Sequence, residues 1–487
     1  MTIRDGSIQI KRLRTVDALR DRLAELGLEL PVDDALECGS DSPLGQPFTI
    51  NDGSGALAVG NRFCVLPMEG WDGTSDGSAT ELVRRRWRRF GQSGAKLVWG
   101  GEAVAVLPDG RANPRQLVIG EHTVEGLASL RRELVDAHVE AVGDAEGLVV
   151  GLQLTHSGRW SRPSGGFEPR VAYRHPLLDE RVGADDSAVL TDEDLDTMIE
   201  AFVVAAVRSA DAGFDFVDLK HCHGYLLHEL LSGTDRSGRF GGSFENRTRF
   251  LREVVSGIRD RAPKLAIGVR LSAYDMIPHI AGSDGRGRAQ IEGPYAHAFG
   301  GDGTGTGVDL DETHRFLDLC TELGIGTVCI TAGSPYYVPH IQRPAFFPPS
   351  DGYQPPQDPL VEVARMVSVT AVLAEAHPAV AIVGTGYSYL QDWAAHVGQS
   401  IVRSGGAASI GLGRMMLSYP DFPRDVLAGA PLRRELVCRT FSDCTTAPRN
   451  GLVSGCYPLD EQYKSMPERV ELAAVKRRQR GDRSRRA

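Results

Sequence analysis

The chain has few cysteines, no long apolar run and no excess of positive charge, and each absence excludes a class of protein. Its 487 residues include 8 cysteines, mostly within apolar segments, which indicates reduced thiols in a cytosol rather than a disulfide framework. The formal net charge of −10 and the pI near 5.8 argue against a nucleic-acid partner, whose phosphates require basic surfaces. No uncharged apolar stretch has membrane-spanning length, and the N-terminus lacks the apolar core of a secretory signal. We therefore expect a cytoplasmic protein that binds neither nucleic acid nor membranes.

One basic stretch, "KRRQRGDRSRRA" at residues 476–487, departs from this acidic balance. A run of like charges is typical of a solvated, disordered tail, and an anionic partner is the alternative interpretation. Otherwise the composition, 41% hydrophobic and 24% charged, is that of a globular enzyme whose core is large enough to hold a site rigidly.

Short apolar segments rich in Val and Ile recur along the chain and alternate with amphipathic patterns. We predict strands at 63–68, 96–106, 148–156, 214–221, 266–273, 327–333, 381–386 and 408–414. Helical patterns lie between them at 80–92, 125–141, 192–211, 243–261, 311–323, 358–376 and 388–404. Apolar strands that alternate with helices indicate a parallel sheet, and eight of them favour a closed barrel over an open doubly wound sheet.

No GxGxxG follows the first strand, which further weakens the open dinucleotide-binding alternative. The fold class that we predict is α/β, a (β/α)8 TIM barrel with N- and C-terminal extensions. We place the extensions at 1–48 and 431–487 and the barrel at 49–430. Long insertions at 275–308 and 334–358 interrupt the barrel, and loops of that length in a compact domain are usually lids or binding loops.

Polar residues and glycines fall where the predicted strands stop, and in a barrel these positions meet at one mouth. They are Glu69, Gly101, Glu102, His156, Arg159, Lys220 to Tyr225, Arg270, Ser272, Thr331, Thr385, Gly386, Gly413 and Arg414. The densest run is "KHCHGY" at 220–225, where so many titratable groups at one strand end indicate a functional site. The alternative is that Lys220 is ion-paired, His221 packs outward and Tyr225 belongs to the core.

Two glycine-containing strand ends, "GTG" at 384–386 and "GLGR" at 411–414, suit a phosphate because glycine lets backbone N–H groups approach a ligand closely. They lie on the last two strands, where barrels commonly bind phosphate, and Arg414 adds a matching charge. Gln153 and Arg270 point into the same mouth, and an amide with a guanidinium suits the edge of a planar heterocycle. Tight turns and a buried polar network are the alternative interpretations.

The stretch "HGYLLHELLSGTDRSGRFGGSFENRTRFLREVV", which begins at His223, resembles the most recognisable motif of the old yellow enzyme family of FMN-dependent oxidoreductases. Other stretches that resemble this family occur in the family's order: "NRFCVLPME", "GAKLVWGGEAV", "QLTHSGR", "GVRLS", "SPYYVPHIQRP" and "GLGRMMLSYPDF". The resemblance covers residues 45 to 425, which is nearly the whole predicted barrel.

The resemblance implies FMN as the cofactor, NAD(P)H as the electron donor and a set of site residues. The residues implied to contact the flavin are Pro67, Met68, Glu69, Gly101, Ala103, Gln153, Arg270, Gly386, Gly413 and Arg414. Tyr225 corresponds to the phenol that protonates the substrate in the ene-reductases, and Lys220 and His223 to the groups that bind its carbonyl oxygen. Tyr336 and His340, in the insertion at 334–358, are predicted substrate contacts.

Two positions depart from the family pattern and leave the substrate open. Lys220 stands where the well-known ene-reductases carry histidine, and Glu69 replaces a small hydroxyl residue after Pro-Met. Because burial readily shifts the pKa of an ammonium group, Lys220 could stabilise an oxyanion, bind a carboxylate or act as a base. A Glu69–Lys220 pair across the mouth would compensate both charges.

The segment "CRTFSDCTTAPRNGLVSGC" resembles the iron–sulfur segment of the branch that contains dienoyl-CoA reductase and trimethylamine dehydrogenase. Cys444 and Cys456 keep the branch's spacing, but Val437 and Thr440 occupy the first two ligand positions and Cys438 is one residue off. Four thiolates are the usual requirement and three are present, so we expect no cluster; the alternative is a cluster or metal with a fourth ligand other than cysteine. We also expect the FAD and NAD domains of that branch to be lacking, so that electrons come from NAD(P)H at the FMN site or from a separate protein.

The function that we predict is FMN-dependent hydride transfer from NAD(P)H to an activated C=C bond of a small enone-like substrate. Tyr225 would be the proton donor, and Lys220 and His223 would bind the oxyanion. The alternatives are oxidation of an amine or a cyclic substrate on the same flavin, a flavin-free barrel with a Schiff base on Lys220, and a non-enzymatic binding protein. A homo-oligomer and a separate electron-transfer partner are both compatible with the sequence.

Overall fold

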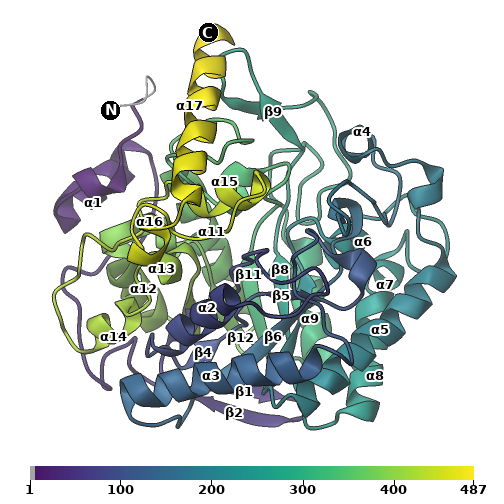
Figure 1. The fold of residues 1–487 in the computed structure, drawn as a ribbon, viewed down its shortest axis with the longest axis horizontal. Coiled ribbons are helices and arrows are strands. Elements are labelled where there is room, and N and C mark those ends of the chain that lie inside the picture. Colours follow the sequence, from purple (N-terminus) through teal and green to yellow (C-terminus); the bar gives the residue numbers. More distant parts are fainter. Residues whose placement is uncertain (1–5, 487) are drawn as a thin grey trace.

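The computed structural model describes residues 6–486 and contains a closed barrel of parallel strands surrounded by helices (Figure 1). The sheet has the strand order β4-β3-β13-β12-β11-β8-β7-β6-β5, and a further pairing of β4 with β6 closes it. Its strands are β3 (Phe63–Val65), β4 (Leu97–Val98), β5 (Ala103–Ala105), β6 (Val149–Thr155), β7 (Phe216–His221), β8 (Ala266–Ser272), β11 (Thr327–Thr331), β12 (Ala381–Gly384) and β13 (Ser409–Leu412). The predicted (β/α)8 barrel is confirmed.

One predicted strand is divided. The segment at 96–106 forms two short strands, β4 and β5, which both pair with β6 and together fill one position of the barrel. The division falls at Gly100, whose φ of 146° lies in the region that favours glycine. A Cβ atom there would lie 3.1 Å from the backbone nitrogen of Gln153, so the close approach of the two backbones requires glycine.

The helices that cover the barrel lie where the amphipathic patterns predict them. They are α2 (Glu81–Gly91), α3 (Val124–Val142), α5 (Asp192–Asp211), α8 (Arg249–Arg261), α9 (Asp311–Glu322), α11 (Pro359–Ala376) and α12 (Ala394–Arg403). Local signals define their starts: Thr191 and Asp194 form a capping box at α5, and Asp358 caps α11. The pattern at 243–261 is broken at Thr248, which separates the short helix α7 (Phe244–Arg247) from α8.

The hydrophobic core has two main layers. Side chains from the strands and the first hairpin fill the barrel interior, where Trp99 and Phe216 meet edge to face at 5.2 Å between ring centroids. A larger cluster lies between the sheet and the surrounding helices and includes Trp87 of α2 and Phe202 of α5. Because the interior is filled on the amino-terminal side, a ligand has room at the carboxyl ends of the strands.

The N-terminal extension packs on the barrel. Helix α1 (Val16–Glu25) buries Leu19 and Leu23 in the outer core layer. The hairpin of β1 (Phe48–Asp52) and β2 (Gly55–Val59) lies below the barrel strands in Figure 1, at their amino-terminal ends. Asp52 joins this hairpin to the barrel, because its carboxylate accepts hydrogen bonds from Arg259 of α8 and from the backbone N–H of Ile267 in β8.

Further elements lie in the loops of the barrel, after β13 and in the C-terminal extension. These are α4 (Asp179–Val182), α6 (Leu226–Leu231), β9 (His279–Ala281), β10 (Gly287–Ala289), α10 (Pro339–Gln342), α13 (Arg414–Ser418), α14 (Phe422–Leu427), α15 (Asp443–Arg449), α16 (Glu461–Lys464) and α17 (Glu468–Arg486). Within residues 6–486, no helix has the length and apolarity that crossing a membrane requires.

The basic segment is helical instead of disordered. Helix α17 includes it up to Arg486, and Ala487 lies outside the described residues. Lys, Arg, Gln and Ala are good helix formers, and the start of α17 is fixed by packing of Leu472 and by an ion pair between Lys476 and Asp443. The repulsion between like charges, on which the predicted disorder rested, is therefore outweighed by the helix propensity of these residues.

We expect Asp52→Ala to lower the free energy of unfolding by about 1.5–3 kcal/mol, the usual loss for hydrogen bonds to a charged group. The Asp52 side chain is fully buried, so the substitution removes the acceptor for Arg259 and for the strand N–H. Denaturant unfolding measures this, with Asp136→Ala on the exposed face of α3 as control, which should change stability by less than about 0.5 kcal/mol. Equal effects of the two substitutions would contradict the role of Asp52.

Candidate active site

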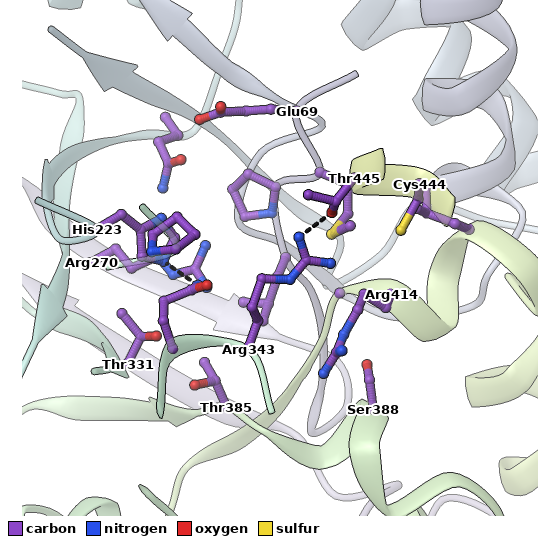
Figure 2. Close-up of a pocket in the computed structure, with 18 of the residues that line it drawn as sticks. Glu69, His223, Arg270, Thr331, Arg343, Thr385, Ser388, Arg414, Cys444 and Thr445 are labelled. Carbon is purple, nitrogen blue, oxygen red and sulfur yellow. Dashed lines mark hydrogen bonds between the residues drawn. The ribbon is translucent and has the colours of Figure 1, made fainter. Parts of the chain in front are cut away.

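A cavity lies at the carboxyl ends of the barrel strands and collects most of the predicted site residues (Figure 2). Its lining includes Pro67, Met68, Glu69, Gln153, Lys220, His223, Tyr225, Arg270, Thr331, Tyr336, Thr385, Gly386, Gly413 and Arg414. Parallel pairing explains this convergence, because residues opposite one another in neighbouring strands reach the same level of the barrel. In this register Lys220 of β7 stands opposite Arg270 of β8, and Gln153 of β6 opposite Asp218 of β7.

Asp218 organises the polar floor of this cavity. Its carboxylate accepts a hydrogen bond of 2.5 Å from the Gln153 side-chain amide and one of 2.6 Å from the backbone N–H of Arg270. Burial raises the pKa of Asp218 to about 6, although these hydrogen bonds favour the charged form. The carboxylate thereby holds the Gln153 amide in one orientation toward the cavity.

Only three of the titratable groups in "KHCHGY" line the cavity: Lys220, His223 and Tyr225. His221 faces the surrounding helices, where its ring lies 5.4 Å from that of Phe316 and burial lowers its pKa to about 4. Cys222 is fully buried, and burial raises the pKa of its thiol to about 12. His223 has a φ of 67°, which is rare for a residue other than glycine and turns its ring into the cavity.

The predicted Glu69–Lys220 ion pair is present. The Lys220 ammonium donates to Glu69 Oε1 at 2.6 Å and lies 3.9 Å from the centre of the Tyr225 ring. The Tyr225 hydroxyl donates to the other carboxylate oxygen, Oε2, at 3.2 Å and lies 2.9 Å from the hydroxyl of Tyr336. Burial first, and the Glu69 charge second, raise the pKa of Tyr225 well above its ordinary value, so this phenol keeps its proton.

His223 is held as a neutral imidazole. Burial lowers its pKa well below the ordinary value, and the nearby charges of Arg270 and Lys220 add to this effect. Its Nε2 atom lies 2.8 Å from the side-chain amide nitrogen of Gln342, and Ser334 donates to its backbone carbonyl at 2.7 Å. A neutral ring of this kind can offer a hydrogen bond to a substrate oxygen without adding a charge.

Three predicted site residues do not reach the cavity lining. Gly101 faces the indole of Trp87, where an added Cβ would overlap the ring. Ala103 is buried in β5, and its carbonyl accepts a hydrogen bond from Gln116 at 3.1 Å. His340 is turned away from the cavity, where its Nδ1 lies 2.7 Å from the Tyr353 hydroxyl and its ring lies 4.6 Å from that of His279.

Other strand-end residues hold the structure together. Arg159 is buried between the carboxylates of Asp179 and Glu229, and Arg86 forms ion pairs with Asp72 and Glu102. His156 is buried outside the cavity lining, and its Nδ1 accepts a hydrogen bond from the backbone N–H of Gly158. The two arginines are thus neutralised by carboxylates within the protein, because a buried charge requires a partner.

The sequence indicated the far wall of the cavity only in part. It is formed by Pro335, Gln342, Arg343 and Pro344 of the insertion at 334–358 and by Cys444, Thr445, Pro448, Arg449 and Ser454 of the C-terminal extension. The two segments are joined by the ion pair of Arg449 with Asp351 and by the stacking of Phe347 on Phe441. The length of the first segment predicted a lid or binding loop, whereas in the second segment only the cysteines indicated a possible site.

The three C-terminal cysteines have different surroundings. Cys438 is buried, whereas Cys444 and Cys456 are half-buried, and all three are free thiols. Figure 2 shows Cys444 beside Thr445 and Arg343 in the cavity wall. Within residues 6–486, no group of three or more His, Cys, Asp or Glu side chains is arranged to hold a metal ion.

One end of the cavity is strongly cationic. Figure 2 shows the guanidinium groups of Arg343 and Arg414 side by side, with Arg414 next to Ser388. Arg343 donates to the Thr445 hydroxyl and Arg414 to the carbonyl of Pro344, and the Nη1 atom of Arg414 is buried without a partner. Burial, together with the charges of Arg414 and Arg449, lowers the pKa of Arg343. Two adjacent guanidinium groups of this kind attract an anion.

The lining therefore has the parts that a phosphorylated flavin requires. Arg343, Arg414 and Gly386, which has a φ of 98°, lie at the cationic end of the cavity, which suits a phosphate. Leu66, Pro67 and Met68 supply an apolar surface, and Gln153 and Arg270 supply polar groups; the Nε atom of Arg270 is buried and has no partner. Tyr336 also lines the cavity, and the ring of Trp160 stacks on it with 4.4 Å between ring centroids.

A cavity of this composition at the carboxyl ends of a parallel (β/α)8 barrel defines a TIM-barrel enzyme site. The model of the NADH:flavin oxidoreductase / NADH oxidase family matches residues 43–286, half of the chain. The chain belongs to this family, the old yellow enzyme family of FMN-dependent oxidoreductases. The family membership predicted from the sequence is thus confirmed.

Two relatives illustrate the range of similarity. The NADPH dehydrogenase of Bacillus velezensis is 32% identical over 237 residues, which cover 47% of this chain and 63% of that protein. The NADPH dehydrogenase of Clostridium acetobutylicum is 34% identical over 225 residues, which cover 45% of this chain and 62% of that protein. The match thus spans less than two thirds of each of these two relatives.

Solved structures share the fold. A 2-naphthoyl-CoA reductase in complex with 2-naphthoyl-CoA has a TM-score of 0.65 and 19% identity, with coverage of 86% of this chain and 57% of that one. An old yellow enzyme homologue from Zymomonas mobilis has a TM-score of 0.55 and 21% identity, with coverage of 82% and 96% respectively. At these identities the likeness concerns the fold.

We expect Arg343→Gln to weaken FMN binding about tenfold, because it removes one of the two adjacent guanidinium groups that suit a phosphate. Riboflavin lacks the phosphate, so its affinity should change little. Fluorescence titration of the apoprotein with both flavins measures the difference, with Arg132→Gln on the exposed face of α3 as the control. An equal loss for both flavins would show that Arg343 does not act on the phosphate.

Proposed function

We propose that the protein is an FMN-dependent reductase that transfers hydride equivalents from NAD(P)H to the activated C=C bond of a small substrate. The observation that carries this proposal is the convergence of a protonated phenol, a neutral imidazole and an ammonium group on the cavity that suits a flavin phosphate. When bound, FMN supplies the hydride, and the chain's own residues supply the binding and the proton.

Gln153, Arg270, Gly386, Gly413 and Arg414 hold the cofactor in this proposal. The amide and the Arg270 guanidinium meet its heterocycle, and the other three, together with Arg343 beside Arg414, meet its phosphate. The Asp218 carboxylate fixes the Gln153 side chain and thus sets the orientation of the cofactor's polar edge.

Lys220 and His223 bind the substrate's carbonyl oxygen, and Tyr225 protonates the carbon next to it. The ammonium and a ring N–H stabilise the negative charge that develops on this oxygen, as in an oxyanion hole. Tyr225 suits the role of general acid, because burial and the Glu69 charge raise its pKa and keep it protonated at neutral pH.

The charges of the cavity disfavour the two alternative chemistries. Its lining contains Lys220, Arg343, Arg414 and Arg449, whereas the Glu69 carboxylate is already paired with Lys220, so a cationic amine meets repulsion. A Schiff base requires a neutral lysine, and the Lys220 nitrogen is held at 2.6 Å from that carboxylate.

The visible absorption spectrum of the protein reconstituted with FMN tests the proposal. We expect anaerobic NAD(P)H to bleach the oxidised flavin and cyclohexenone to restore its absorbance. Bleaching by an amine in the absence of NAD(P)H would instead favour the oxidative alternative. A protein that takes up no FMN would contradict the proposal altogether.

Tyr225→Phe should slow the reduction of cyclohexenone about 10²- to 10⁴-fold, the usual contribution of a general acid. Reduction of the flavin by NAD(P)H should be affected far less, since that step needs no proton from the phenol. Stopped-flow measurement of the two half-reactions separates these effects. Equal slowing of both half-reactions would contradict the assignment of Tyr225 as the proton donor.

A further inference from the structure

The carboxylate of Glu69 joins two groups with different tasks in the proposed reaction. It accepts a hydrogen bond from Lys220 on Oε1 at 2.6 Å and one from Tyr225 on Oε2 at 3.2 Å. Each carboxylate oxygen therefore accepts a hydrogen bond from one of the two groups. The loop after β3 that carries Glu69 is thus coupled directly to the proposed proton donor.

Exposure distinguishes Glu69 from its two partners. Its side chain is 19% exposed, whereas the Lys220 side chain is 1% exposed and Tyr225 is 2% exposed. The second hydroxyl in this cluster, that of Tyr336, lies 2.9 Å from the Tyr225 hydroxyl and belongs to the same wall of the cavity. The Glu69 carboxylate therefore contacts both the Tyr225 hydroxyl and solvent, and it can accept and release a proton.

Each turnover leaves Tyr225 without its proton. Once the phenol O–H bond breaks and the substrate carbon gains the proton, a phenolate is left in a buried position next to a carboxylate. Burial and the Glu69 charge both disfavour a phenolate at this position, as the raised pKa of Tyr225 shows. A new proton has to arrive before the next turnover, and a buried phenol cannot take it from bulk water directly.

We propose that Glu69 carries protons from solvent to Tyr225 after each turnover. Water gives a proton to the Glu69 carboxylate, and the resulting acid passes it to the Tyr225 oxygen, so that both groups return to their starting states. The substrate gains one proton, solvent loses one, and no electrons move in this step.

Lys220 keeps this relay in place. Its ammonium group neutralises the carboxylate and holds it at the distance that allows exchange with the Tyr225 hydroxyl. The same charge lies 3.9 Å from the centre of the Tyr225 ring, where it stabilises the transient phenolate. Glu69 acts on the substrate through Tyr225, so it is a positioning and relay residue for the proposed reaction, on which this inference rests.

Glu69→Gln tests the relay, because glutamine keeps the shape but cannot pass a proton onward. Its carbonyl oxygen can still accept from Lys220, while its amide NH2 can only donate to the Tyr225 oxygen. We expect the ratio of cyclohexenone turnover to menadione turnover to fall about 10²-fold, since reduction of the quinone requires no proton on carbon. Glu69→Asp should restore part of the ratio, and Glu125→Gln on the exposed face of α3 is the matched control.

Infrared difference spectra during cyclohexenone turnover provide a second readout. The wild-type protein should show a transient protonated carboxyl band that shifts in D2O, and Glu69→Gln should lack it. A wild-type protein without this band, or a variant that loses both turnovers in proportion, would overturn the relay. A wild-type protein that reduces menadione but not cyclohexenone would instead overturn the proposed alkene reduction.

Discussion

Closure of the parallel sheet, through the pairing of β4 with both β3 and β6, is the constraint on which the site depends. A closed parallel sheet brings the carboxyl ends of all its strands to one mouth, whatever their distance along the chain. The cavity lining accordingly combines Leu66, Gln153, Lys220, Arg270 and Gly413 from five different strands or the loops that follow them. An open sheet would spread the same residues along an edge.

The barrel forms only one side of the cavity. The insertion at 334–358 and the C-terminal extension form the other side, and they are fastened to each other by hydrogen bonds, an ion pair and aromatic stacking. The C-terminal segment whose cysteines suggested an iron–sulfur site thus contributes Thr445 and Arg449 to the lining. In this chain the extension is part of the site's wall.

The positively charged side chains of the cavity differ in whether a carboxylate of the protein neutralises them. Arg86 is fully paired by Asp72 and Glu102, and Lys220 is paired with Glu69, so neither requires a ligand for neutrality. Arg343 and Arg414 form no carboxylate ion pair within residues 6–486, and their bonds go to a hydroxyl and a carbonyl. The cavity thus has one region in which positive charges are neutralised by carboxylates of the protein. In another region they are not, and that region suits an anionic group.

The sequence by itself determined the order of strands and helices, the closed fold and the strand ends at which functional residues lie. These follow from local periodicity and from capping signals such as Thr191 and Asp358, which act over a few residues. The Glu69–Lys220 pair could also be predicted, because both residues stand at strand ends and carry opposite charges.

Tertiary structure alone decided which side chains enter the cavity. The left-handed backbone at His223 turns its ring inward, while His221 two residues earlier faces Phe316 and His340 contacts Tyr353. Arg343 and Arg449 reach the site only because two segments distant in sequence pack together. The direction of a side chain in a loop depends on contacts with residues far along the chain, and such contacts leave no periodic pattern in the sequence.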